Sequence, residues 1–142
     1  MGNDSIKFTT DTIRSMNLFE EVTGVEVKDA ITKGNKAYFV VEEGKAGLAI
    51  GKGGETIKKV QNNLDKDVKV YEFSDSLQEF VKNIVPVKVN GVKMDRGEES
   101  TEVRIDVDRG KWSRVVGKDG RNIEVIERFL KREFGVDNVE LE

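Results

Sequence analysis

The sequence contains neither cysteine nor histidine, and these two absences remove several kinds of chemistry at once. Without cysteine the chain forms no disulfide and offers no thiolate to a metal. Without histidine it lacks imidazole ligands and the side chain that most readily exchanges protons near neutral pH. Asp, Glu, Lys and Ser remain, but we expect no metal, no cofactor and no enzymatic activity.

Long apolar segments are missing as well. No apolar run approaches the roughly 18 residues needed to span a bilayer, and the N-terminus lacks the apolar segment of a secretory signal. We therefore expect a cytoplasmic protein with no membrane contact. A chain of 142 residues with 36% charged residues suits one medium domain or two small ones with a large surface.

Charge is distributed unevenly along the chain. The net charge is −3, which by itself argues against nucleic-acid binding. Two segments nevertheless carry an excess of positive charge, 45–59 and 109–121. Their basic residues are Lys45, Lys52, Lys58 and Lys59 in the first, and Arg109, Lys111, Arg114, Lys118 and Arg121 in the second. A solvated helix face and a phosphate-binding patch both remain open on charge alone.

A glycine-containing tetrapeptide occurs twice, in equivalent surroundings. Gly51-Lys52-Gly53-Gly54 and Gly117-Lys118-Asp119-Gly120 lie 66 residues apart, and their neighbourhoods align at this shift without a gap. Upstream, the best shift is 62, with Val25 on Val87 and Val27 on Val89. The second copy therefore has four extra residues, which we expect in a hairpin loop around 92–100. The sequence predicts two copies of one module, residues 1–74 and 75–142, with almost no linker between them.

Hydrophobic periodicity predicts the same order of elements in both copies: helix, two strands, short helix, loop, long helix, strand. In the first copy the expected helices are 10–21, 45–50 and 55–64, and the strands are 25–31, 38–41 and 68–73. In the second copy the helices are 77–84, 111–116 and 121–134, and the strands begin at 87, 103 and 136. The residues expected to face the core include Ile13, Met16 and Phe19 or Leu18; Ile57, Val60 and Leu64; and Ile123, Ile126, Leu130 and Phe134.

Residues typical of helix ends support these predicted helices. Ser76 and Glu79 have the spacing of a capping box, and Pro86, the only proline, ends the helix that follows. Gly24 and Gly135 are placed to end two other helices.

The tetrapeptide alone does not indicate a function, because 14 glycines supply roughly one or two Gly-x-x-Gly strings by chance. Its position between helices is the specific signal. A third string, Gly44 to Gly47, is not followed directly by a long helix. The other two join a short helix to a long one. There, glycine allows a tight turn and close approach of a sugar–phosphate chain, and the next helix N-terminus favours an anion. Lys52 and Lys118 add positive charge over the phosphates.

The loop between two helices, preceded by Ile50-Gly51 and Val116-Gly117, resembles the K homology (KH) domain. That resemblance implies a clamp on about four single-stranded nucleotides per loop. With the helix–strand pair placed first, both copies resemble the type II form: an α+β fold in which a three-stranded mixed sheet packs on helices. We expect no C-terminal helix after Leu141. Two such modules resemble the short archaeal NusA-like transcription elongation and termination factors, which implies binding to a nascent transcript and contact with RNA polymerase by a monomer.

The residues expected to contact RNA combine the two loops, their flanking cations and an apolar groove floor. They are Ile50, Gly51, Lys52, Gly53, Gly54, Ile57, Lys111, Val116, Gly117, Lys118, Asp119, Gly120 and Arg121, and Ile123 completes the floor. Asp119 places a negative charge inside the second loop. Phosphate contacts hold a strand without reading its sequence, so the floor would read the bases.

The same sequence allows other interpretations. Trp112 could stack on a base, but packing is the simpler role. Asp106 and Asp108 share a strand face, but no other residue converges on them to suggest a metal site or acid–base pair. The acidic pI of about 5.3 keeps open a KH-fold scaffold bound to RNA polymerase or the ribosome with weak RNA binding. A phosphate-loop nucleotide hydrolase is disfavoured, because this sequence lacks the Gly-x-x-x-x-Gly-Lys-Ser/Thr spacing that such enzymes require.

Overall fold

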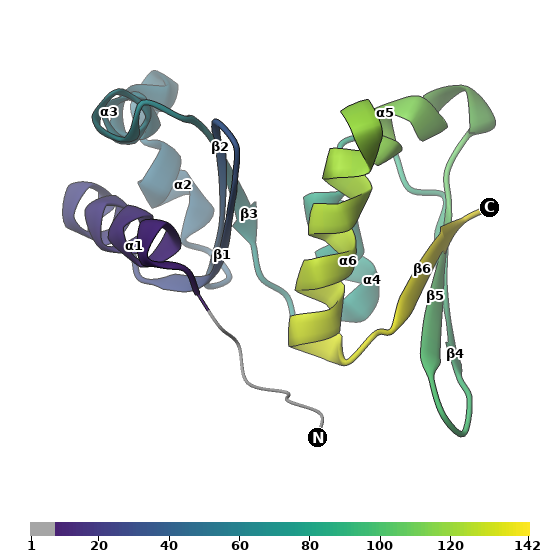
Figure 1. Cartoon of the computed structure of the whole chain (residues 1–142). Coiled ribbons are helices and arrows are strands. Elements are labelled where there is room, and N and C mark those ends of the chain that lie inside the picture. Colours follow the sequence, from purple (N-terminus) through teal and green to yellow (C-terminus); the bar gives the residue numbers. More distant parts are fainter. Residues whose placement is uncertain (1–7) are drawn as a thin grey trace. The chain divides into compact units, whose positions relative to one another are not determined.

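The computed structural model describes residues 8–142, so the first seven residues of the expected first module lie outside it. Contacts divide the described chain into two compact units, one ending at Ser74 and the other starting at Asp75. Each unit contains three helices longer than one turn and a three-stranded sheet (Figure 1). The expected α+β class with a three-stranded mixed sheet is confirmed.

The first unit follows the expected order of elements. Its helices are α1 (Thr10–Thr23), α2 (Ala46–Ile50) and α3 (Glu55–Leu64), and its strands are β1 (Val27–Lys33), β2 (Lys36–Val41) and β3 (Asp67–Glu72). The strands lie in the order β1-β2-β3, with β1 antiparallel and β3 parallel to the central β2. A parallel pair needs a crossover, and α2 and α3 supply it.

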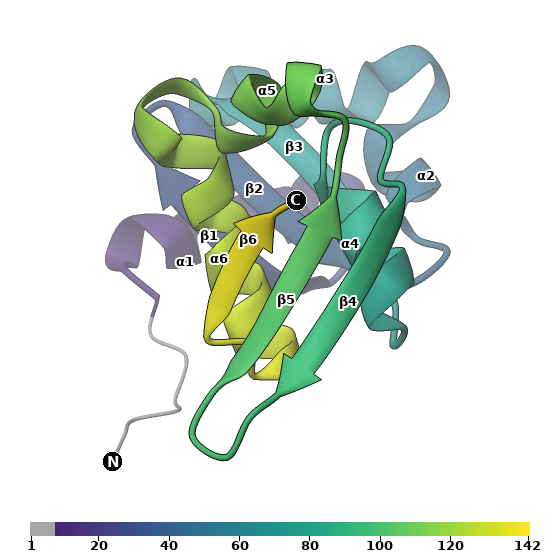
Figure 2. The ribbon, with the colours of Figure 1, turned by 90° about the vertical axis from the view of Figure 1, so that its right-hand side faces the viewer.

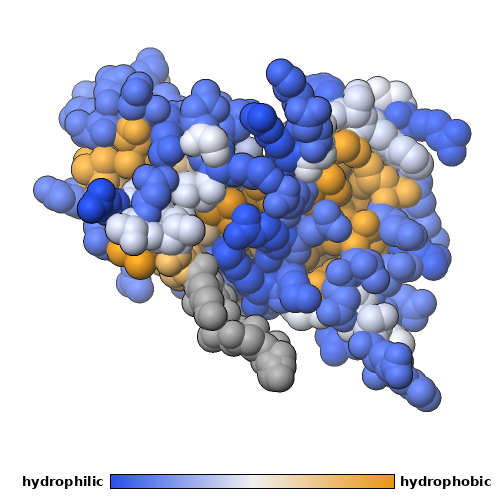
Figure 3. Space-filling model, viewed as in Figure 1, coloured by the Kyte–Doolittle hydropathy of each residue, from blue (hydrophilic) through white to orange (hydrophobic). Residues whose placement is uncertain are grey.

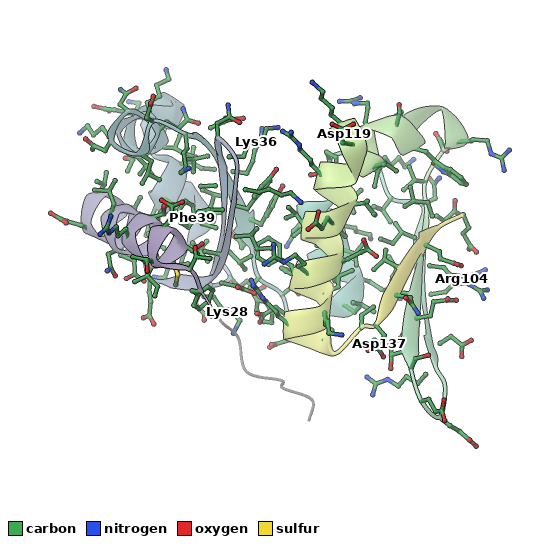
Figure 4. All side chains as sticks on the ribbon, viewed as in Figure 1. Lys28, Lys36, Phe39, Arg104, Asp119 and Asp137 are labelled. Carbon is green, nitrogen blue, oxygen red and sulfur yellow. The ribbon has the colours of Figure 1, made fainter. Side chains whose placement is uncertain are left out.

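The core of the first unit lies between the sheet and its helices. Phe19 from α1 stacks on Phe39 from β2 with ring centroids 4.4 Å apart, and both side chains are fully buried. Figure 4 labels Phe39 on its strand. Ala49 of α2 and Val60 of α3 belong to the same buried cluster. The short helix α2 therefore packs on the core through Ala49, which fixes the position of the loop that follows it.

The second unit repeats this arrangement. Its helices are α4 (Leu77–Ile84), α5 (Trp112–Val116) and α6 (Arg121–Phe134), and its strands are β4 (Gly91–Arg96), β5 (Thr101–Asp106) and β6 (Asn138–Leu141). Figure 2 shows these three strands side by side, with α4 and α6 behind them. Again the outer strands run antiparallel and parallel to the central one.

The second hairpin differs from the expectation in two ways. Val87 and Val89 precede the strand, which begins at Gly91, and the expected loop around 92–100 is reduced to 97–100. Apolar Val92 and Met94 alternate with charged residues, so this segment continues the ladder. The pair Arg96–Thr101 extends the hairpin by one pair beyond the position of Lys33–Lys36 in the first unit, and the turn has four residues instead of two.

Two helix faces also differ from the expectation. Ile13 is 46% exposed, whereas the polar Thr12 and Ser15 face inward. In α6 the fully buried side chains are Val125, Ile126, Phe129 and Leu130, while Ile123 and Phe134 are only partly buried. The buried stripe is therefore wider than the apolar spacing indicated. No helix in the described part of the chain is long and apolar enough to cross a membrane.

Candidate nucleic-acid interface

The two tetrapeptides form corners with nearly the same backbone. After α2, Gly51 has φ 78° and ψ 169°, and after α5, Gly117 has φ 77° and ψ 172°. The third and fourth loop positions also match: φ is 63° at Gly53 and 56° at Asp119, and 76° at Gly54 and 74° at Gly120. Each loop forms one tight turn, closed by a hydrogen bond from its fourth to its first residue, before the long helix begins. The sequence repeat is thus a structural repeat at this corner.

The first glycine of each loop is required on two grounds. Its combination of φ and ψ lies in a region that is essentially restricted to glycine. A Cβ at Gly51 would lie 2.3 Å from Thr56 Oγ1, and a Cβ at Gly117 would lie 2.8 Å from Asn122 Cβ. The next helix therefore approaches this backbone closely, and only glycine leaves room for it.

The third and fourth positions are less restricted. A Cβ at Gly53 or Gly120 would meet nothing within 4 Å, and one at Gly54 would lie 3.9 Å from Ile57 Cγ2. Their positive φ is the only constraint, and aspartate tolerates this left-handed conformation better than most residues. Asp119 therefore fits the second loop without displacing a neighbour.

Hydrogen bonds hold each corner while leaving donors free. Gly51 N donates to Gly47 O at 2.9 Å and Gly54 N donates to Gly51 O at 3.1 Å; the equivalent bonds at Gly117 and Gly120 measure 2.9 and 3.2 Å. Within residues 8–142, these bonds leave the N–H groups of the second and third loop positions unused. Two neighbouring free N–H groups at a helix N-terminus suit an anion such as a phosphate.

The charged side chains around the loops point into solvent. Lys52, Lys111, Lys118 and Arg121 are exposed, and none takes part in an ion pair within the described chain. Asp119 is exposed as well and lies at the N-terminal end of α6 (Figure 4). The first loop therefore contains a lysine and no acid but is followed by the exposed Glu55, whereas the second contains an acid between two cations.

The residues expected to form the groove floor lie at these corners. Ile50, the last residue of α2, is 38% exposed, and Ile57, Val116 and Ile123 are partly buried. Their neighbours Ala49 and Val115 are fully buried. Each short helix thus buries one apolar side chain and leaves the next within reach of solvent. The structure places one such set in each unit.

Two side chains near the second loop have structural partners. Trp112 Nε1 donates to Val107 O at 2.8 Å, which supports the packing interpretation, and the Arg109 guanidinium lies 5.2 Å from the indole ring. Asn122 Nδ2 donates to Val115 O at 2.9 Å and so ties α6 to the end of α5. Apolar spacing gave no indication of Asn122, whose only signal in the sequence is its position five residues after Gly117, where the first unit has Thr56.

The possible metal ligands do not gather. No group of three or more Asp or Glu side chains suited to a metal occurs among residues 8–142. Asp106 ends β5, whereas Asp108 lies beyond it and accepts a hydrogen bond from Asn90 Nδ2 at 3.0 Å.

Comparison with known proteins agrees with this geometry. A family model described as the KH domain matches residues 7–95. A Methanococcus vannielii protein named probable transcription termination protein NusA is 34% identical over 137 residues, covering 96% of this chain and 79% of the relative. A protein of the same name from Halococcus morrhuae is 35% identical over 130 residues, covering 91% and 93%. The chain belongs to the archaeal NusA family of KH-domain proteins.

A solved structure supports the fold of this NusA-family chain. The crystal structure of APE1850 is 33% identical, covers 95% of this chain and all of its own, and superposes with a TM-score of 0.78. The similarity therefore extends over both units and not over the KH match alone.

Proposed function

We propose that this NusA-family protein binds single-stranded RNA, such as a nascent transcript, and acts in transcription termination or antitermination. The observation that carries the proposal is the duplicated corner. The two loops have the same backbone conformation, and each presents unused N–H groups beside an exposed lysine. Such a corner suits the phosphates of a strand and not its bases. The relatives' name places the family in transcription.

We further propose that both units are type II KH domains, with residues 1–74 as the first and 75–142 as the second. The family model covers all described residues of the first unit but only the beginning of the second. The second unit has the same order of elements and the same loop conformation as the first. RNA polymerase is the expected protein partner.

The mechanism follows from the parts of each corner. The free N–H groups of the loop and the N-terminus of the long helix bind a phosphate, and the lysine adds a mobile positive charge. The apolar side chains of Ile50 and Ile57, or of Val116 and Ile123, lie beside the bases. Each loop holds about four nucleotides.

The test is RNA affinity of the double variant Gly53→Asp with Lys118→Asp, measured at fixed salt. Both sites are exposed, so the fold should survive, and a thermal melt verifies this. We expect affinity for a single-stranded RNA oligomer to fall by roughly tenfold or more.

The matched control is Gly34→Asp with Arg96→Asp. Gly34 has φ 61° and open space around it, like Gly53, and Arg96 is an exposed cation at a hairpin end. The control makes the same change in net charge away from the loops and should bind RNA nearly as the parent does. Equal affinity of parent and loop variant would refute the proposal and favour a protein scaffold.

A further inference from the structure

A small pocket lies in the first unit, beside α2. Its volume is about 180 Å³, and it is lined by Gly24, Val25, Glu26, Glu42, Lys45 and Leu48. Sites for whole small molecules usually measure several hundred Å³. A pocket of this size instead suits a single side chain.

Leu48 makes this pocket unusual. It is 62% exposed, more than Ile13 or Ile50, the other exposed large apolar residues of the described chain. Residues of an α-helix are separated by about 100°, so Leu48 and Ile50 point to nearly opposite sides of α2. Ile50 leads into the glycine loop, and Leu48 faces the segment after α1. The pocket is therefore separate from the proposed RNA groove.

The charge at the pocket opposes nucleic acid. Glu26 and Glu42 are the acids among the lining residues, and Lys45 is the only cation among them. The exposed Glu43 follows Glu42 directly. No ion pair within residues 8–142 uses the side chains of these three glutamates or of the lysine. A phosphate chain would be repelled here, whereas a lysine or arginine would find two acceptors.

The second unit does not repeat this surface. At the 66-residue shift, Arg114 stands at the position of Leu48. At the upstream shift of 62, Lys88 stands at the position of Glu26. Of the two acids in the lining, only that of Glu42 is retained, as Asp108. Two basic residues thus replace one apolar and one acidic residue of the pocket lining. The character of the pocket is not a general consequence of the fold, because the second unit lacks the exposed leucine and one of the two acids. In the view of Figure 3, hydrophobic surface occurs in separate patches among hydrophilic residues.

We propose that the Leu48 pocket binds a partner protein segment that presents one apolar side chain next to a lysine or arginine. The apolar side chain enters between Val25 and Leu48, and the basic group meets Glu26 and Glu42. This site goes beyond the RNA-binding function and is independent of it. Charge complementarity and pocket size together select this occupant over a nucleic acid or a free small molecule.

The test selects peptides from a displayed random library against the purified full chain. We expect enriched peptides to contain an apolar residue adjacent to Lys or Arg. Synthetic versions should bind the Leu48→Glu variant roughly tenfold more weakly or worse, because the apolar contact is lost and a charge is placed at the pocket. Their binding should also weaken as salt rises.

The matched control is Ile13→Glu, which makes the same change at another exposed apolar position, on α1. It should leave peptide binding unchanged. Glu26→Gln with Glu42→Gln supplies a second probe that does not disturb packing, and it should abolish the preference for basic over neutral peptides. No enrichment, enrichment of acidic peptides, or equal binding by Leu48→Glu would overturn the proposal.

RNA affinity of the same variants separates the two proposals. Leu48→Glu and the Glu-to-Gln pair should bind the RNA oligomer as the parent does, since the pocket lies on the other side of α2. Loss of RNA binding in Leu48→Glu with an intact fold would place Leu48 in the RNA groove and would overturn the separate site. If the loop variants bound RNA as tightly as the parent, the RNA proposal would fail, and the peptide-binding proposal would be unaffected.

Discussion

At the scale of single residues, the four positions of each loop differ in what they tolerate. Gly51 and Gly117 have a backbone conformation restricted to glycine and a neighbour that leaves no room for a Cβ. Gly53 is constrained only by its positive φ. Among described residues with side chains, only Asp65 and Asp119 have positive φ. The first loop position is thus set by folding, and the third is free to vary with function.

Replacing the first glycine should destabilise the fold. We expect Gly51→Ala to lower the free energy of unfolding by roughly 2–4 kcal/mol, from backbone strain and the clash with Thr56. Gly53→Ala should cost only about 1–2 kcal/mol, because nothing lies near its Cβ. Chemical denaturation of both variants measures the difference. Equal losses would show that Thr56 moves away without cost.

Asp119 should weaken RNA binding by the second loop. Removing its charge with Asp119→Gly leaves the left-handed backbone in place and removes repulsion of a phosphate. Because two charges 4 Å apart interact by about 1 kcal/mol in water, RNA affinity should rise roughly 3–5-fold. Gly53→Asp should lower it by a similar factor. Asp65→Gly, at the other positive-φ aspartate, is the control; a gain there as well would indicate a general charge effect.

Tyr71 should make stability depend on alkaline pH. Burial, with a smaller effect from the neighbouring Tyr38, raises the pKa of Tyr71 to about 12 from 10.0. The folded state therefore favours the neutral phenol, and its contribution is complete below pH 10 and is lost as pH rises from 10 to 12. The loss is roughly 1–3 kcal/mol, since one pKa unit corresponds to about 1.4 kcal/mol. Denaturation of Tyr71→Phe should show a shallower decline; the same slope would exclude this tyrosine as the cause.

At the scale of elements, capping signals in the sequence translate directly into contacts. Ser76 Oγ accepts from Glu79 N at 3.3 Å at the start of α4, as the spacing predicted. Ser76→Ala should lower the free energy of unfolding by about 1 kcal/mol. Ser113→Ala, at an exposed serine of α5 whose side chain has no cap role, should change it little. Thermal or chemical denaturation compares them, and equal effects would argue against the cap.

Helix faces were harder to predict than helix ends. Spacing of apolar residues selected Ile13, but α1 turns Thr12 and Ser15 inward. Their hydroxyls are satisfied internally: Thr12 Oγ1 lies 2.6 Å from Thr32 Oγ1, and Ser15 Oγ donates to Asp11 O at 2.9 Å. Burying a polar group costs little once it is hydrogen-bonded. Apolar periodicity cannot detect the Thr12–Thr32 pair because Thr32 lies on β1, and it does not register the bond that Ser15 makes within its own helix.

At the scale of the whole molecule, the sequence repeat predicted the two loops and most elements, but not the Leu48 pocket. The loops are local, so a 66-residue shift reveals them. The pocket is lined by residues 24–26, by Glu42 and by α2, three segments that only folding brings together. The second hairpin illustrates the same limit, because its extra residues lengthen the ladder as well as the turn.

RNA affinity should fall steeply with salt even though the chain carries a net charge of −3. Binding to a strand releases counterions locally, so the cations at the loops matter and the total charge does not. Each phosphate contact contributes about 0.7 to the slope of log affinity against log salt for single strands. Lys52→Gln with Lys118→Gln should therefore reduce the slope by about 1.4, whereas Arg96→Gln should leave it unchanged. Titrations at several salt concentrations measure the slopes. If the slope stayed the same in the lysine variant, the cations that contact RNA would lie outside the two loops.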